Sequence, residues 1–388
     1  MAGSKASRAK KTPTSEVLAV GPLPPPLDGT SVSFQVFCQE ASSLLPPEGL
    51  NIVDSSPREL KDEGHRHGWS DLRQAARILG PFLRRIPSTD RILIFGSNGF
   101  LLKMAPILLL AARLAGKPCY IRPFGGSLDT FWGSLPRIPR RLLTWALRSA
   151  DGVLVQTQLL SRNLQPLIGR TPHVVSGYRP VSDHLVEPTS ADRHRSDVRL
   201  CFVGHIREEK GVLLLLEALR RLSELGDSGV SCDLYGPIYQ SVQSRFRDDL
   251  ERTPSARFMG MLPADRVIPT MQTYDALVFP SYYDGEGHPG VLIEAMMAGL
   301  PIIASDHRAL AEVVEHEVNG LLIKPRDVQS LTEALTRIVN SRELRQAMAT
   351  RSQLMAKQYD SRSAVRLILS ILGIALRPPN EAPGETTL

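Results

Sequence analysis

The chain has 388 residues, of which 42% are hydrophobic, so it can bury a large core and fits two domains better than one. Its formal net charge of +6 is a mild excess that suits anionic ligands or an acidic lipid surface, and it is too weak to indicate a nucleic-acid-binding protein. Four scattered cysteines without a CxxC pair argue against a zinc site or a disulfide framework. They predict reduced, buried thiols in a cytoplasmic protein: Cys38, Cys119, Cys201 and Cys232.

Both ends of the chain have the composition of disordered tails. Residues 1–15 are basic and rich in small side chains, without the apolar run that a secretory signal needs. Residues 378–388 have the Pro, Gly and Glu content of a loose segment. The longest apolar stretches, at residues 100–116 and 364–376, fall short of the roughly 20 residues that a spanning helix requires. The sequence therefore predicts two tails and no transmembrane segment.

Between the tails, short β-branched runs alternate with helix-length segments, which is the pattern of a parallel α/β sheet. In the first half, the expected strands are EVLAVG, RILIFGS, KPCYIRPF and GVLVQT. After a polar connector that contains Pro and Ser, the pattern restarts with RLCFVG, SCDLYG, ALVFPS and LPIIASD. The sequence predicts two Rossmann-like, doubly wound domains, at residues 16–185 and 196–360, and a helix over 361–377 that crosses back to the first domain.

One segment of the first half, residues 136–151, interleaves basic and apolar side chains. One interpretation is a basic amphipathic helix that lies on an anionic membrane, which would place the protein at the inner face of that membrane. The other is a helix that packs its apolar side on the sheet and solvates its charges. The basic residues are Arg137, Arg140, Arg141 and Arg148, and the apolar residues between them are Leu142, Leu143, Trp145 and Leu147.

Two loops of the second half carry the candidate chemistry, because ligands of such sheets bind beyond the carboxyl ends of the strands. FVGHIREEKG, residues 202–211, places Gly204 at a strand end and Lys210 at the start of a helix, where free N–H groups favour an anion. DGEGHPGVLIEA, residues 284–295, places Glu286 in a glycine-rich loop and Glu294 in a helix that begins near Gly290. Such a helix start can hold a diphosphate, whereas a carboxylate suits the paired hydroxyls of a sugar. The two glutamates around a phosphate site predict a nucleotide-sugar site.

These motifs together resemble family 4 of the retaining glycosyltransferases. EGHPGVLIE resembles the family's E-x7-E motif, and FVGHIREEKG resembles its Gly-Arg … Lys-Gly phosphate loop. GPLPPPLDGTS, residues 21–31, resembles its N-terminal glycine loop, and RPFGGSLD and GVLVQT resemble the strand ends below its acceptor cleft. The likeness runs from about Val17 to about Leu376. It implies the α/β fold called GT-B, in which two Rossmann-like domains face a central cleft.

The resemblance also implies roles for the residues that match the E-x7-E motif and the phosphate loop. Glu294 would bind the nucleotide ribose, and Glu286 would bind the transferred sugar. The backbone of Gly290 and Val291 would contact the distal phosphate, which Lys210 would neutralise. The segment FMGML, residues 258–262, resembles the one whose backbone reads the nucleobase.

The phosphate loop departs from the family pattern at one position, where His205 replaces the usual arginine. The second phosphate cation is then either Arg207, two positions further on, or His205 itself, whose charge depends on pH near neutrality.

In the first half of the chain, Gly29 follows Asp28 in the Pro-rich loop of residues 21–31. The resemblance implies that Gly29 approaches the donor phosphate, while a rigid turn is the plain alternative.

The acceptor side departs as well, because the chain has Gly125 and Gly126 where many members place a histidine. Asp129 is the nearest ionisable residue, and it is either part of the acceptor site or a helix cap without a catalytic role. Enzymes of this family are thought to use a same-face mechanism in which the leaving phosphate takes the acceptor's proton, so no protein base is required. No carboxylate pair has the spacing of a divalent-ion site, which predicts metal-independent transfer without a cofactor.

The sequence therefore predicts a retaining glycosyltransferase that moves a sugar from a nucleotide-diphosphate-sugar to a saccharide or lipid-linked saccharide, in polysaccharide or glycolipid biosynthesis. One alternative is a non-catalytic assembly protein with the same fold. Another is a dinucleotide-dependent oxidoreductase, which would need a G-x-G-x-x-G motif that GPLPPPLDG does not supply. The nucleobase, the sugar and the acceptor stay open, and no nucleic-acid partner is expected.

Overall fold

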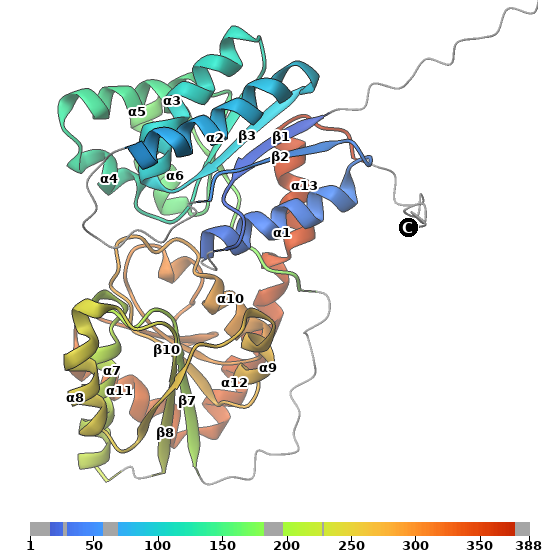
Figure 1. The fold of residues 1–388 in the computed structure, drawn as a ribbon. Helices are drawn as coiled ribbons and strands as arrows, with labels where there is room; N and C mark the ends of the chain where they lie inside the picture. Colours follow the sequence, from blue (N-terminus) through green and yellow to red (C-terminus); the bar gives the residue numbers. More distant parts are fainter. Residues whose placement is uncertain (1–15, 26–28, 57–68, 182–196, 227–228, 377–388) are drawn as a thin grey trace, which may run out of the picture. The chain divides into compact units, whose positions relative to one another are not determined.

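The computed structural model describes residues 16–25, 29–56, 69–181, 197–226 and 229–376, and these residues form two six-stranded parallel sheets flanked by helices (Figure 1). The predicted doubly wound α/β class is thereby confirmed. The predicted tails, the connector between the halves and Asp28 lie outside the described residues.

The first sheet has the strand order β2-β1-β3-β4-β5-β6. Its strands are short apolar runs, and β1 is buried along its whole length, as expected for a central parallel strand covered on both faces. Phe34 and Phe37 of the first helix pack on Phe95 of β3, with ring centroids 4.9 and 4.8 Å from that of Phe95. The elements are β1 Val17–Gly21, α1 Gly29–Leu44, β2 Leu50–Asp54, α2 Trp69–Arg85, β3 Arg91–Gly96, α3 Asn98–Leu114, β4 Cys119–Pro123, α4 Leu128–Ser134, α5 Arg137–Ser149, β5 Gly152–Val155, α6 Gln158–Ile168 and β6 His173–Val174.

The second sheet has the strand order β12-β11-β10-β7-β8-β9. Figure 1 shows α7, α8 and α11 on one of its faces and α9, α10 and α12 on the other, and each set buries an apolar cluster against the strands. The elements are β7 Val198–Val203, α7 Val212–Glu224, β8 Val230–Tyr235, α8 Gln243–Glu251, β9 Ala256–Gly260, α9 Val267–Met271, β10 Ala276–Phe279, α10 Gly290–Met297, β11 Ile302–Ser305, β12 Gly320–Ile323, α11 Val328–Asn340 and α12 Arg342–Ala356. The chain then continues into α13, Ser361–Ile371.

The order of the second sheet places its topological switch between β7 and β10. These strands are neighbours, and Leu277 of β10 pairs with Cys201 of β7. The chain builds outward from β7 in one direction through β8 and β9, and from β10 in the other through β11 and β12. Because successive crossovers leave a crevice at such a point, the loops that follow β7 and β10 line the expected binding position.

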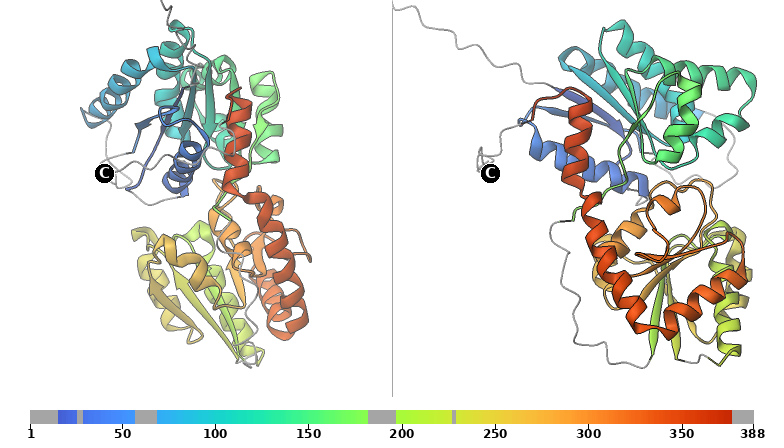
Figure 2. Two further views of the ribbon diagram at one scale, coloured as in Figure 1. Left: turned by 90° about the vertical axis from the view of Figure 1, so that its right-hand side faces the viewer. Right: turned by 180° about the vertical axis from the view of Figure 1, so that it is seen from behind.

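Residue contacts divide the chain into two compact units, and each unit is assembled from separate stretches of the sequence. The described residues up to 122, residues 141–153 and those from 365 onward form one unit, and residues 123–140 and 154–364 form the other. In the first unit, Arg91 Nε donates a hydrogen bond of 2.9 Å to the carbonyl of Leu372, just after α13. Figure 2 shows α12 leading into α13. The domain bounds expected from the sequence stay a prediction.

The structure also describes the four cysteines and the long apolar helices of the chain. All four cysteines are buried and are not joined in disulfides, as predicted, and burial raises the pKa of the Cys38 thiol to about 12. In the part of the chain that the structure describes, no helix has the length and apolar character needed to cross a bilayer.

Candidate functional site

The loops after β7 and β10 bring together Lys210 and Glu286, which are 76 positions apart in the sequence. The ammonium and the carboxylate form an ion pair, and Ser281 Oγ donates a second hydrogen bond, of 2.7 Å, to the same carboxylate oxygen. The side chains of Lys210 and Glu286 are only 16% and 7% exposed. A charged pair with so little water around it is held in place strongly, and its remaining hydrogen-bonding capacity is available to a ligand.

The environment of Lys210 also determines the direction of its side chain. Its Nζ lies 5.3 Å from the ring centroid of Phe279 and 5.2 Å from that of Tyr283, within the range of cation–π attraction. Phe279 is the last residue of β10, so the strand end itself helps to position the ammonium. Lys210 is therefore a preorganised positive charge at the topological switch.

The other two candidate phosphate cations lie in the same loop and both contact Tyr239. Arg207 donates to both carboxylate oxygens of Glu209, at 3.0 and 3.3 Å, and its guanidinium carbon lies 5.1 Å from the ring centroids of Tyr239 and Tyr283. The hydrogen bonds with Glu209 raise the pKa of Arg207 further. The His205 ring lies 5.4 Å from that of Tyr239. Since Glu209 already balances Arg207, its role as the second phosphate cation stays a prediction, as does that of His205.

The helix α10 begins at Gly290, where the sequence predicts phosphate binding. Its N-cap residue is Pro289, and no side chain caps the helix start, so the backbone donors of the first turn are not satisfied by a cap. Glu294, one turn into the helix, accepts a hydrogen bond of 2.6 Å from Arg179 Nε. Arg179 was not predicted from the sequence, and the pair joins residues 115 positions apart.

A second unpredicted group, His288 with Glu312, holds the loop between the two motif glutamates. His288 Nδ1 accepts a hydrogen bond of 3.3 Å from the amide of Gly177, and its Nε2 lies 3.3 Å from a carboxylate oxygen of Glu312. The amides of Gln158 and Leu159, at the start of α6, each donate to Glu312 at 2.8 Å. Burial works to raise the pKa of Glu312, but these hydrogen bonds lower it overall.

The predicted acceptor-side glycines lie directly against the loop of Glu286. The amide of Gly126 donates a hydrogen bond of 3.0 Å to the carbonyl of Gly285. An ideal Cβ on Gly126 would lie 1.9 Å from the carbonyl oxygen of Glu286, so only glycine permits this approach. Gly125 has a φ of +77°, which also favours glycine. The pair of glycines therefore places the loop after β4 beside the sugar-binding glutamate of the prediction.

Asp129 is the second residue of α4, whose N-cap is Ser127, so it does not occupy the cap position that the sequence allowed. Its carboxylate accepts hydrogen bonds of 2.6 Å each from Arg308 and Asn163. Burial opposes ionisation, but these two hydrogen bonds lower the pKa of Asp129 overall. Arg308 has a φ of +53° and also donates to the carbonyl of Gly126. These contacts point to a structural use of Asp129.

Gly29 is the first residue of α1 and belongs to the other contact unit, so its approach to the donor stays a prediction.

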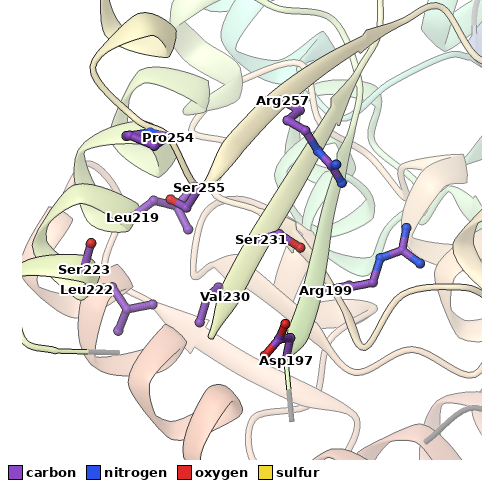
Figure 3. A pocket seen from close by; sticks show the side chains of 10 residues that line it. All are labelled: Asp197, Arg199, Leu219, Leu222, Ser223, Val230, Ser231, Pro254, Ser255 and Arg257. Atoms are coloured by element: carbon purple, nitrogen blue, oxygen red, sulfur yellow. The ribbon is translucent and has the colours of Figure 1, made fainter. Parts of the chain in front are cut away.

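A cavity of about 540 Å³ lies at the amino-terminal end of the strands of the second sheet, opposite the loops that carry Lys210 and Glu286 (Figure 3). Its two arginines, Arg199 and Arg257, both pair with Asp233, at 3.8 and 2.9 Å. The cavity is therefore separate from the switch-point loops. Among the described residues, no group of three or more His, Cys, Asp or Glu side chains is arranged to hold a metal ion.

Comparison with known proteins finds a family model that is similar to the second half of the chain. Residues 190–355 match the family model "Glycosyl transferases group 1". The amylovoran biosynthesis glycosyltransferase AmsK of Erwinia amylovora is 30% identical over 38% of this chain and 37% of its own length. The 2-deoxystreptamine glucosyltransferase of Streptomyces kanamyceticus is 27% identical over 60% of this chain and 64% of its own length. The chain thus spans about a third to two thirds of the length of these relatives.

Solved structures extend the likeness to the whole fold. Anabaena HepE, solved in complex with UDP, superposes with a TM-score of 0.73 over 92% of this chain and 99% of its own, at 17% identity. The sucrose-phosphate synthase of Thermosynechococcus elongatus superposes with a TM-score of 0.69 over 92% of this chain and 98% of its own, at 14% identity. Residues 190–355 thus match the group 1 glycosyl transferases, family 4, and the two sheets of the chain form the GT-B fold.

Proposed function

We propose that the chain is a retaining glycosyltransferase that uses a nucleoside diphosphate sugar as its donor. The observation that carries the proposal is the meeting of Lys210 and Glu286 at the switch point of the second sheet, where the loop of Glu286 leads into the uncapped start of α10. A preorganised cation, a helix start and two carboxylates match the parts of such a donor, which are a diphosphate and two sets of sugar hydroxyls. HepE, whose fold this chain shares, was solved with UDP-glucose, which makes uridine donors the first to test.

In the proposed reaction, the bond between the sugar C1 and the phosphate oxygen breaks, and a bond from C1 to the acceptor oxygen forms on the same face. The acceptor's proton passes to the departing phosphate, so the chain needs no base. Lys210 stabilises the negative charge that grows on the diphosphate, together with the start of α10. Glu286 holds hydroxyls of the transferred sugar, Glu294 holds the ribose, and the acceptor is a saccharide or a lipid-linked saccharide.

A thermal-shift screen against UDP-, GDP- and ADP-sugars tests the donor. A true donor at ~100 times its dissociation constant should stabilise the protein by about 2.7 kcal/mol. Donor hydrolysis or transfer should then accompany binding and should survive EDTA, since the charge at the diphosphate comes from side chains and a helix start. Absence of any shift would contradict the donor proposal, and binding without turnover would favour the non-catalytic assembly protein. Activity abolished by EDTA and restored by Mg²⁺ or Mn²⁺ would show the site model to be wrong.

We also propose that α3 and α5 contact an anionic membrane, where a lipid-linked acceptor would be found. Leu143, Ala146 and Leu147 of α5 are buried, but Ile138, Leu142 and Trp145 are exposed, by 82, 45 and 37%. The helix α3 connects β3 to β4, and α5 connects β4 to β5 in the same direction along the first sheet, so both helices lie on the same face of that sheet. On α3, the apolar side chains of Ile107, Leu110 and Leu114 are also exposed. Between Arg91 and Ala150 the sequence has nine Lys and Arg residues, of which Arg122 is buried, and one acidic residue, Asp129, which is paired with Arg308.

Vesicle sedimentation should detect this contact. The protein is expected to bind vesicles of phosphatidylcholine with phosphatidylglycerol, and to bind phosphatidylcholine alone much more weakly. Changing Arg137, Arg141 and Arg148 to Gln should weaken binding about 100-fold, since each arginine near such a surface contributes about 1 kcal/mol. A matched triple change to Gln on helices that flank the second sheet, at Arg221 of α7, Arg245 of α8 and Arg337 of α11, should leave binding unchanged. Equal weakening by both triple changes would contradict a specific contact.

A further inference from the structure

The guanidinium of Arg179 lies over the first turn of α10. Its Nε donates a hydrogen bond of 2.6 Å to Glu294, and its side chain is 11% exposed. An ideal Cβ on Gly290 would lie 1.6 Å from Arg179 Nη2 and 2.3 Å from Cζ. The guanidinium therefore touches the Cα of the first residue of α10 and reaches from there to the carboxylate one turn later.

The backbone around Arg179 is held on both sides, so this position is built into the fold. Its amide donates to the carbonyl of Tyr359 at 2.9 Å, and its carbonyl accepts from the amide of Ser361 at 2.9 Å. Its Nη1 also donates to the carbonyl of Tyr178 at 3.0 Å. A side chain with so many rotatable bonds loses much entropy when it is fixed, and here that loss precedes ligand binding.

A cation at the start of a helix is unfavourable by itself, because the helix dipole places partial positive charge there. Glu294 supplies one negative charge beside Arg179, but the open backbone donors of α10 attract a second anion. A diphosphate satisfies both, since a guanidinium presents its planar set of donors to the oxygens of one phosphate while the helix start presents its amides to the other.

We propose that Arg179 binds the donor phosphate that adjoins the ribose, while its Nε holds Glu294 in place for the ribose hydroxyls. The inference rests on the proposed function, and it names a phosphate cation from outside the β7–α7 loop. In that loop His205 stands where the family has arginine, and Arg207 is bound by Glu209. Like Lys210, Arg179 is paired with a motif glutamate, and it provides a further positive charge at the diphosphate.

The test compares ligands that differ only in phosphate number. Dissociation constants are measured for uridine, UMP and UDP, with the guanosine and adenosine series in parallel, on wild type and on Arg179→Gln. We expect Arg179→Gln to weaken binding of the mono- and diphosphate about 10- to 100-fold, the range for hydrogen bonds to a charged group, and to weaken nucleoside binding much less. Arg179→Lys, which keeps the charge but not the planar donor set, should give an intermediate loss.

Glu294→Gln separates direct phosphate binding from an effect through the carboxylate. In the Glu294→Gln background, Arg179→Gln should still weaken UDP binding relative to uridine. Arg337→Gln, which removes an exposed arginine of α11, serves as the control for net charge and should change nothing. Equal losses for uridine and UDP, or no loss in either Arg179 variant, would overturn the inference while leaving the proposed function intact. A wild type that binds no nucleoside diphosphate at all would overturn both.

Discussion

Lys210→Ala is expected to lower turnover by about 100-fold or more and to raise the donor's Michaelis constant far less. The ammonium is preorganised by Glu286, Phe279 and Tyr283, so it stabilises charge that develops as the sugar–phosphate bond breaks. Interactions that strengthen in the transition state act on turnover, and one such charge stabiliser typically contributes a factor of this size. Steady-state kinetics with the donor found by the screen measure both constants.

The control for this prediction has to account for the carboxylate that Lys210 leaves behind. Without the ammonium, Glu286 is a buried charge whose described partner is Ser281, and the protein should lose stability as well. Assays well below the unfolding temperature of the variant, and a second variant Glu286→Gln that keeps Lys210, separate the two effects. A Michaelis constant that rises while turnover stays unchanged would mean that Lys210 contributes only to ground-state binding.

The sequence predicted the parts of the site that are local in the chain. The strand-end loops with Lys210, Glu286 and Glu294 were recognisable because each motif is contiguous, and the strand order then brings them together. The list of expected strands missed β2 and β6 in the first sheet, and β9 and β12 in the second. The strand β9 alternates between more buried and more exposed residues, and β12 has only four residues. The strand β6 has only two residues, and β2 is only partly buried along most of its length, so neither has the long apolar run that marks a central strand.

The unpredicted site residues share a different property, since each depends on a contact between distant positions. Arg179 and Glu294 are 115 residues apart, and Arg308 and Asp129 are 179 apart. No periodicity of the sequence reports such a pair, because tertiary packing alone determines it. The one local signal was Gly290, whose missing Cβ makes room for the guanidinium of Arg179.

Asp129→Asn is expected to destabilise the protein by about 3 kcal/mol at pH 7, because it leaves Arg308 buried without its counter-charge. The side chains of Arg308 and Asp129 are 14 and 10% exposed, so water replaces the lost interaction poorly. If the role of Asp129 is structural, turnover measured well below the unfolding temperature should change only a few-fold. Urea unfolding and steady-state kinetics give the two quantities.

The pH dependence of the same variant provides the sharper check. The pKa of Asp129 is lower in the folded state than its ordinary value of 3.8, so its ionised form stabilises the fold above that value and the contribution is lost as pH falls through the folded pKa. The stability difference between wild type and Asp129→Asn should therefore be constant from pH 7 to about 5 and should shrink below about pH 4. Arg308→Gln should cause a similar loss, and the double variant should lose less than the sum of the two. Additive losses, together with a turnover that falls about 100-fold in Asp129→Asn alone, would instead assign Asp129 to the reaction.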